Sequence, residues 1–220
     1  MTGFGWKGVA WDVDGTLIDS EPLHHAALVD VAAQLGLDLT QLDPMHFVGV
    51  HIKDVFLALR DGLPAGLPCA AFEAMVEDAY VRGTDRLAPL DGAAETMLAL
   101  AACGIGQVCV SNSSRRIVQA NLKRLGAQHV VSGLICLDDV AAGKPDPEPY
   151  LRGAALLDLA PADVLAVEDS VAGATAALAA GMHVAMIGAP SQAWPKDPRL
   201  MPIRRLAEIR HLQPVTAGVA

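Results

Sequence analysis

The stretch Gly8-Val9-Ala10-Trp11-Asp12-Val13-Asp14-Gly15-Thr16-Leu17 decides the fold, because it leads from an apolar run into two carboxylates. Residues 8–13 are short, apolar and followed by a turn signal, so they predict a buried strand. Open parallel sheets bind ligands at the carboxyl ends of their strands, where Asp12 and Asp14 are expected to lie. Two acids there cost desolvation free energy unless a cation offsets their charge. The stretch therefore predicts a metal site at a sheet edge.

Composition and charge exclude several classes of protein. Hydrophobic residues make up 52% and charged residues 19% of the 220 positions, which predicts a substantial folded core. No apolar run reaches the roughly 18 residues of a membrane span, and the first residues lack a signal-peptide pattern. The formal net charge of −9 argues against a nucleic-acid partner but allows a small phosphate ester. The cysteines are widely separated, so we expect reduced thiols in a cytoplasmic protein.

Helices are expected between the aspartate loop and residue 90. Residues 21–35 have amphipathic helical spacing with Ser20 as the N-cap, and residues 53–61 and 70–82 also have a helical pattern. This block contains no convincing strand. We therefore predict a helical cap domain at 19–90, inserted into a core formed by 1–18 and 91–220.

Strands and helices alternate after Asp91. Helical segments separate apolar segments that we predict to be strands, at 107–110, 130–136, 164–167 and 183–187. Such alternation predicts a parallel sheet with right-handed crossovers, which is the α/β class. The region rich in proline and arginine at 190–205 has no clear pattern.

Three predicted strands end in polar residues. These ends are Asp12 with Asp14, Ser111 with Asn112, and Glu168 with Asp169. Any one of them could simply cap the following helix. Taken together, and with Lys144 in a proline-flanked loop, they predict one site, because the carboxyl ends of parallel strands meet at the same edge.

Four short motifs carry a resemblance to a known family: D-V-D-G-T at 12–16, S-N-S at 111–113, K-P at 144–145 and E-D at 168–169. In this order and spacing they resemble the haloacid dehalogenase-like hydrolases, in the branch with a helical cap after the first motif. The nearest patterns are those of β-phosphoglucomutase-like and phosphoglycolate-phosphatase-like members. The resemblance covers essentially the whole chain. It implies a Rossmann-like core and a mobile cap.

The resemblance also implies roles for the acidic residues. Asp12 would attack phosphorus to form an aspartyl-phosphate, and Asp14 would protonate the leaving oxygen and then deprotonate water. Mg²⁺ would be held by the Asp12 carboxylate, the Asp14 backbone carbonyl and Asp169. Glu168 would be a further ligand or would support one.

The phosphoryl oxygens would be bound, by the same resemblance, by Ser111 and Lys144. Asn112 and the backbone amides near Gly15 and Thr16 would help. Thr16 could instead only cap the turn.

The expected cap holds the residues that would select the substrate. Glu21 and His24 lie in D-S-E-P-L-H, a run that resembles the sugar-phosphate branch, although His24 could equally pack within its helix. Gly49, His51 and Lys53 lie in a stretch that resembles the substrate-specificity loop.

One departure from the mutase pattern decides between two reactions. The mutase has an arginine that grips the non-reacting phosphate of a bisphosphate, and Ile52 aligns with that position. Lys53 is expected to be an ordinary solvated lysine. Water is then the expected acceptor, which predicts a Mg²⁺-dependent phosphatase acting on a small phosphorylated metabolite, such as a sugar or polyol phosphate. We expect the protein to be a monomer. The alternatives are a phosphomutase, a 2-haloacid dehalogenase, for which Asp14 is not needed, and a non-catalytic metabolite-binding protein.

Overall fold

The structure is a computed structural model that describes residues 4–43, 46–47 and 49–214. The chain divides into two compact units, one formed by Met1–Ile18 with Pro89–Ala220 and the other by Asp19–Ala88. The predicted domains placed the second boundary after residue 90. Two short strands, β2 (Ile18–Asp19) and β3 (Ala88–Pro89), pair with each other where the chain passes from one unit to the other.

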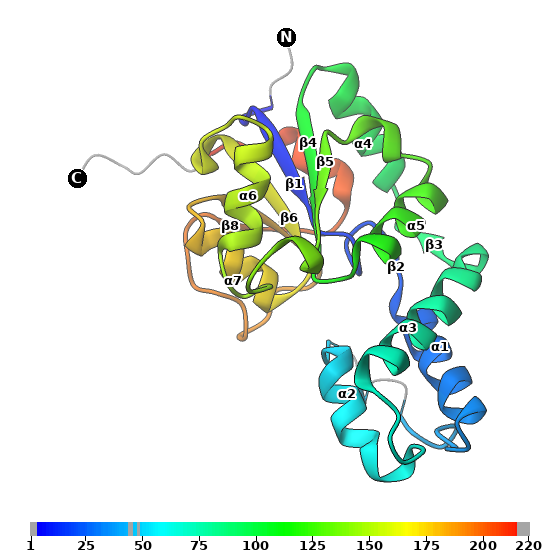
Figure 1. Cartoon of the computed structure of the whole chain (residues 1–220). Coiled ribbons are helices and arrows are strands. Elements are labelled where there is room, and N and C mark those ends of the chain that lie inside the picture. The colour runs from blue at the N-terminus through cyan, green and yellow to red at the C-terminus, as the bar shows by residue number, and fades with distance from the viewer. Residues whose placement is uncertain (1–3, 44–45, 48, 215–220) are drawn as a thin grey trace. The chain divides into compact units, whose positions relative to one another are not determined.

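The first unit is built on a six-stranded sheet with the order β5-β4-β1-β6-β7-β8, in which all pairings are parallel (Figure 1). The predicted α/β class is therefore confirmed. The strands are β1 (Gly8–Trp11), β4 (Gly106–Val110), β5 (Gly133–Ile135), β6 (Val164–Glu168), β7 (His183–Ile187) and β8 (Leu200–Ile203).

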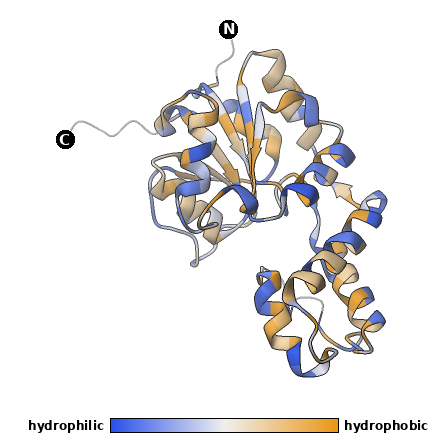
Figure 2. Cartoon of the chain, viewed as in Figure 1, coloured by the Kyte–Doolittle hydropathy of each residue, from blue (hydrophilic) through white to orange (hydrophobic). Residues whose placement is uncertain are grey.

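The central position of β1 explains why its residues are apolar. It lies between β4 and β6, and Trp11 is in register with Cys109 on one side and Val167 on the other. The strands of this sheet are coloured largely hydrophobic in Figure 2, as expected for strands covered on both faces. The register places the residues that follow these three strands at one edge.

Helices cover both faces of the sheet. On one face, Tyr150 and Ala174 belong to the same buried cluster as Ala10 of β1. On the other, Trp11 Nε1 donates to Gln107 Oε1 at 2.9 Å, and Gln107 Nε2 donates to the backbone carbonyl of Met97 at 2.9 Å. Side chains alternate across a strand, so these two sets lie on opposite faces. The helices of this unit are α4 (Ala93–Ala102), α5 (Arg115–Leu125), α6 (Glu148–Leu156) and α7 (Val171–Ala179), with short 3₁₀ turns η3 (Gln128–Val130), η4 (Leu137–Asp139), η5 (Pro161–Asp163) and η6 (Leu206–His211).

The second unit is helical, as predicted. Leu23 and Val31 are buried on α1, and the Phe72 ring on α3 packs against Phe56 with ring centroids 5.6 Å apart. Ser20 occupies the N-cap position of α1, as predicted, but its side chain makes no capping hydrogen bond. The elements of this unit are α1 (Glu21–Gln34), α2 (Ile52–Leu59), α3 (Cys69–Arg82), η1 (Arg60–Gly62) and η2 (Thr84–Arg86).

The helices and the cysteines agree with the composition of the chain. Among the described residues, none of the helices is both long and apolar enough to cross a membrane. All four cysteines are free thiols, as expected from their spacing.

Candidate active site

Three carboxylates meet where β1 and β6 end. Asp12 directly follows β1, Glu168 is the last residue of β6, and Asp169 comes next. One ligand oxygen from each lies within 4.8 Å of the others. Asp12 is 6% exposed and Glu168 is fully buried, so the cluster carries a desolvation cost that a cation must offset.

Lys144 supplies one buried positive charge to this cluster. Its Nζ donates to Asp12 Oδ1 and to Glu168 Oε1, both at 2.6 Å. Burial opposes the charge on Lys144, but the Asp12 and Glu168 carboxylates outweigh that effect and raise the pKa of the ammonium group. The two carboxylates therefore favour the charged form of Lys144.

Asn112 holds the loop that carries Lys144. Its Oδ1 accepts from the Lys144 backbone N–H at 2.8 Å, and its Nδ2 donates to the Lys144 carbonyl at 3.0 Å. The side chain that was predicted to help bind phosphate thus contacts the lysine loop in this structure.

The buried Glu168 carboxylate is fully hydrogen-bonded. Its Oε1 accepts from Tyr150 Oη at 2.5 Å as well as from Lys144, and its Oε2 accepts from Ser170 Oγ at 3.0 Å. Burial and the Glu168 charge raise the pKa of Tyr150 well above its ordinary value, so the phenol stays a donor. On α7, Gly173 has no side chain where a Cβ would overlap the Glu168 carboxylate.

Two carboxylate groups retain the capacity to bind a cation. Asp12 Oδ2 is buried and has no hydrogen-bond partner among the described residues. Burial, followed by the nearby acids Glu168, Asp169 and Asp14, raises the pKa of Asp12 in spite of Lys144. Asp169 accepts from Thr16 Oγ1 at 3.4 Å.

Asp169 lies at the rim of the cluster and is exposed as a residue. Its carboxyl group is nevertheless partly desolvated, and this burial together with the Glu168 charge raises its pKa to about 6. Hard oxygen donors of this kind are the ligands that Mg²⁺ prefers. The donor set therefore fits the predicted Mg²⁺.

Asp14 belongs to a second group of contacts. Its Oδ2 accepts from Ser113 Oγ at 2.8 Å and Ser111 Oγ at 3.2 Å, and its Oδ1 accepts from Asn121 Nδ2 at 2.9 Å. Ser111 Oγ also accepts from the Ser113 backbone N–H at 3.0 Å. The carboxylate of Asp14 thus lies between the β4 loop and α5.

Gly15 closes the loop that presents both aspartates. Its backbone has φ 80°, and a Cβ there would overlap the Asp169 carboxylate. The loop is held by the Gly15 N–H, which donates to the Ile18 carbonyl at 2.8 Å. Glycine is therefore required both by the left-handed backbone and by the close approach of Asp169.

The predicted cap residues lie in the second unit, where several have local contacts. The His24 ring packs on Tyr80 with centroids 4.3 Å apart, and His51 caps α2 by accepting from the Lys53 backbone N–H at 3.2 Å. Glu21 lies in the first turn of α1, and Gly49 has φ 72°. Their assignment to a substrate site stays a prediction.

Three residues that contact the acidic side chains were not predicted from the sequence, namely Tyr150, Asn121 and Ser170. Asn121 had a detectable signal, because it is a polar residue on the apolar stripe of α5 formed by Val118, Leu122 and Leu125. Tyr150 had none, since a tyrosine in a helix is ordinarily a packing residue.

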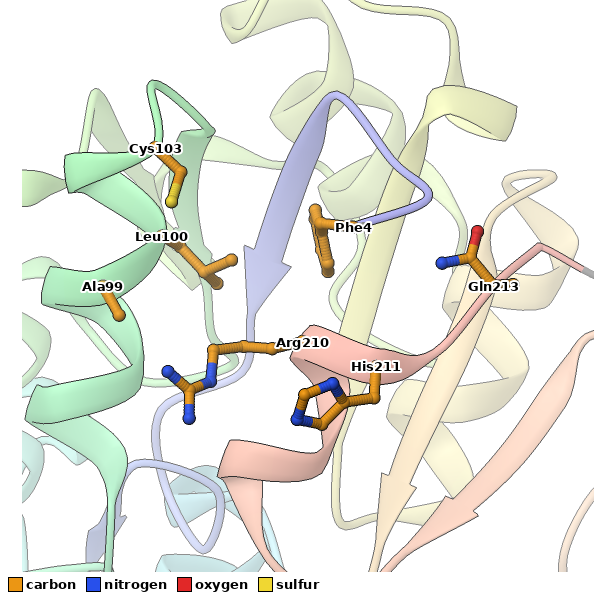
Figure 3. A pocket seen from close by; sticks show the side chains of 7 residues that line it. All are labelled: Phe4, Ala99, Leu100, Cys103, Arg210, His211 and Gln213. Carbon is orange, nitrogen blue, oxygen red and sulfur yellow. The ribbon is translucent and has the colours of Figure 1, made fainter. Parts of the chain in front are cut away.

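A cavity of about 440 Å³ lies elsewhere in the first unit. Figure 3 shows its lining side chains, which come from the segment before β1, from around the end of α4 and from η6 and just after it, and none of them belongs to the carboxylate cluster. None of the described residues that line it is acidic, which distinguishes it from the carboxylate cluster. It is lined by Phe4, Ala99, Leu100, Cys103, Arg210, His211 and Gln213.

Comparison with known proteins agrees with this arrangement. The chain is 32% identical over 193 residues to hexitol phosphatase A of Escherichia coli, which covers 84% of each chain. It is 31% identical to validoxylamine A 7′-phosphate phosphatase of Streptomyces hygroscopicus subsp. limoneus, over 80% of this chain and 83% of that one. The crystal structure of CbbY from Rhodobacter sphaeroides in complex with phosphate has the same fold, with a TM-score of 0.78, 24% identity and coverage of 93% and 96%.

The family comparison extends over most of the chain. The family model of the haloacid dehalogenase-like hydrolases matches residues 6–181, which include all four motifs. With the parallel sheet and the clustered strand-end carboxylates, this match shows that the chain belongs to the haloacid dehalogenase-like hydrolases.

Proposed function

We propose that this hydrolase is a Mg²⁺-dependent phosphatase of small phosphate monoesters, with a phosphorylated sugar or polyol as its substrate. The observation that supports it best is the buried Asp12, with one oxygen on Lys144 and the other without a hydrogen-bond partner among the described residues. The relatives named hexitol phosphatase A and validoxylamine A 7′-phosphate phosphatase support the substrate class.

In the first step an Asp12 carboxylate oxygen attacks phosphorus. The bond from phosphorus to the leaving oxygen breaks, and Asp14 gives that oxygen a proton, so an alcohol departs and an aspartyl-phosphate remains. Lys144, which is ion-paired with Asp12, offsets the negative charge of the Asp12 carboxylate and of the incoming phosphoryl group. Ser111, Lys144 and backbone amides near Gly15 and Thr16, other than the Gly15 N–H that donates to Ile18, bind the phosphoryl oxygens.

In the second step a water molecule attacks the phosphorus of the aspartyl-phosphate. Asp14, now a carboxylate, takes a proton from the water, and the bond between phosphorus and the Asp12 oxygen breaks. Inorganic phosphate leaves, and both aspartates return to their starting protonation states. One difficult displacement is thereby divided into two easier ones.

The Asp12 carboxylate, Asp169 and the backbone carbonyl of Asp14 would hold Mg²⁺. When bound, the ion offsets the negative charge shared by the carboxylates and the phosphoryl group. We assign Glu168 to a supporting role, because its oxygens already accept from Lys144, Tyr150 and Ser170. Glu168 then fixes the lysine in place.

Other parts of the proposal concern residues outside the acidic cluster. Asn112 positions the Lys144 loop through its two hydrogen bonds. Glu21, His24, Gly49, His51 and Lys53 select the substrate. We further propose a cytoplasmic monomer without a nucleic-acid or membrane partner, in keeping with its free thiols and its net charge of −9.

The test is phosphate release by the purified protein from sugar phosphates, polyol phosphates and phosphoglycolate, with Mg²⁺ or with a chelator. We expect turnover with Mg²⁺, and background release for Asp12→Asn because the nucleophile is lost. Asp163→Asn, which changes an exposed carboxylate, should keep full activity. Activity that survives Asp12→Asn would contradict the mechanism, and isomerisation of glucose 1-phosphate exceeding its hydrolysis would favour a phosphomutase.

A further inference from the structure

We infer that Asn121 is a positioning residue for the acid–base carboxylate Asp14. This inference rests on the proposed function, because it takes the role of Asp14 from it. Asn121 lies in the middle of α5, far along the chain from the aspartate loop, and its Nδ2 donates to Asp14 Oδ1 at 2.9 Å.

The environment of Asn121 shows why an amide there requires an explanation. The side chain is fully buried, and it shares the inward face of α5 with Val118, Leu122 and Leu125. Burying an amide costs free energy unless it is hydrogen-bonded, so burial of an apolar residue at this position would cost less free energy. A polar residue that breaks the local pattern in this way is typical of a functional site.

The contacts on Asp14 show what the amide does. Asn121 Nδ2 donates to Asp14 Oδ1, and Ser113 Oγ donates to Asp14 Oδ2 at 2.8 Å. The two donors therefore bind different oxygens of the same carboxylate. Contacts at both oxygens fix the rotation of the group about its Cβ–Cγ bond. Asp14 is only half-buried and lies directly before the turn at residues 15–17, so burial alone does not fix the rotation of its side chain.

A fixed carboxylate matters most when the leaving group needs a proton. An alkoxide is a poor leaving group, so loss of an aligned general acid slows attack on an alkyl phosphate. The p-nitrophenolate ion departs without protonation, so the same loss has little effect on p-nitrophenyl phosphate. The ratio of the two kcat/KM values therefore reports the alignment of Asp14, since kcat/KM covers the steps up to release of the alcohol and excludes hydrolysis of the aspartyl-phosphate.

The experiment measures kcat/KM of wild type and Asn121→Ala on a sugar-alcohol phosphate and on p-nitrophenyl phosphate. We expect the alkyl substrate to lose about 10- to 100-fold and the aryl substrate about threefold or less. Hydrolysis of the aspartyl-phosphate also uses Asp14, so this second step should be slower in Asn121→Ala. Because the first step on the aryl substrate stays fast, both kcat and KM for that substrate should fall. A burst of p-nitrophenol in rapid mixing should accompany it.

Val118→Ala is the matched control, because it shortens a buried side chain on the same face of α5 that has no polar atom with which to hydrogen-bond Asp14. It should lower thermal stability while leaving the ratio of the two substrates at the wild-type value. Equal losses on both substrates in Asn121→Ala, or no loss on either, would overturn the positioning role. A wild-type enzyme inactive on every phosphate ester would instead overturn the proposed function, and the inference with it.

Discussion

Lys144 is the residue on which the charge balance of the site depends. Its side chain is 4% exposed and lies between two carboxylates that are themselves 9% and 0% exposed. Removing one partner of a buried ion pair leaves an uncompensated charge and costs about 3–5 kcal/mol. We expect Lys144→Met to abolish turnover and to lower the free energy of unfolding by that order in a chelator, as measured by urea denaturation.

A second lysine provides the comparison for this prediction. Lys7 pairs with Asp163 at 3.0 Å, but the two side chains are 67% and 38% exposed. Exposed pairs contribute about 0–1 kcal/mol, so Lys7→Met should have little effect on either stability or turnover. Equal stability losses in the two variants would show that burial of Lys144 does not matter.

Some residue-scale features could be predicted from sequence and others could not. Asp12, Ser111, Lys144 and Asp169 were identifiable because each lies in a short motif next to a strand end. Tyr150 was not, because its hydrogen bond to Glu168 depends on the packing of α6 against the sheet. Asn121 lies between these cases, since its helical register was predictable but its partner across 107 residues was not.

At the scale of elements, α7 is shaped around the site by a glycine. Gly173 is in the first turn of a helix whose inward side is otherwise mostly alanine, and Glu168 occupies the space of its missing Cβ. Intrinsic propensity predicts that alanine would stabilise a helix interior by about 1 kcal/mol relative to glycine. At position 173 alanine should instead be destabilising, because its Cβ would overlap the Glu168 carboxylate.

We therefore expect Gly173→Ala to lower the melting temperature and to reduce turnover at least about tenfold, since Glu168 would shift away from Lys144. Thr175→Ala, at an exposed position two residues later, should leave activity unchanged. Calorimetry and steady-state kinetics would check both. A more stable and fully active Gly173→Ala enzyme would show that Glu168 tolerates displacement.

The elements themselves were predicted unevenly. The strand predicted at 183–187 is β7, and the strand at 107–110 begins one residue earlier as β4, because buried parallel strands form distinct apolar runs. The strand predicted at 130–136 is shorter, because η3 occupies its start and only Gly133–Ile135 pairs with β4. β8 was missed because its four residues include Pro202 and lie at the sheet edge, where proline is tolerated.

At the scale of the whole molecule, a cation held by the acidic cluster would stabilise the folded state, because the cluster forms only on folding. Saturation at about a hundred times Kd would add about 2.7 kcal/mol, which for this chain length is a rise in melting temperature of roughly 5–10 °C. We expect Mg²⁺ to give such a rise over a chelator control. Asp169→Asn should reduce it, whereas Asp163→Asn should not.

This stabilisation should depend on pH in a defined direction. The folded, metal-free Asp169 has a pKa of about 6 against an ordinary value of 3.8, so its proton stabilises the folded state at low pH and that stabilisation is lost as the pH rises through about 6. Mg²⁺ needs the ionised carboxylate, so its effect grows over the same range. The Mg²⁺-induced rise in melting temperature should thus be larger at about pH 7.5 than at about pH 5. A shift independent of pH would argue against Asp169 as a ligand.

The place of β1 in the sheet also has a consequence for synthesis on the ribosome. β1 is made first, yet its neighbours begin at Gly106 and Val164, so it emerges long before either can pair with it. Pairing across such separations is slow, and an unpaired apolar strand favours aggregation. The strand that leads to Asp12, the proposed nucleophile, is thus synthesised well before the two strands that enclose it. A translation product that stops before β6 therefore leaves Val9-Ala10-Trp11 unpaired on the side that β6 covers, and we expect it to bind chaperones rather than to act as an enzyme.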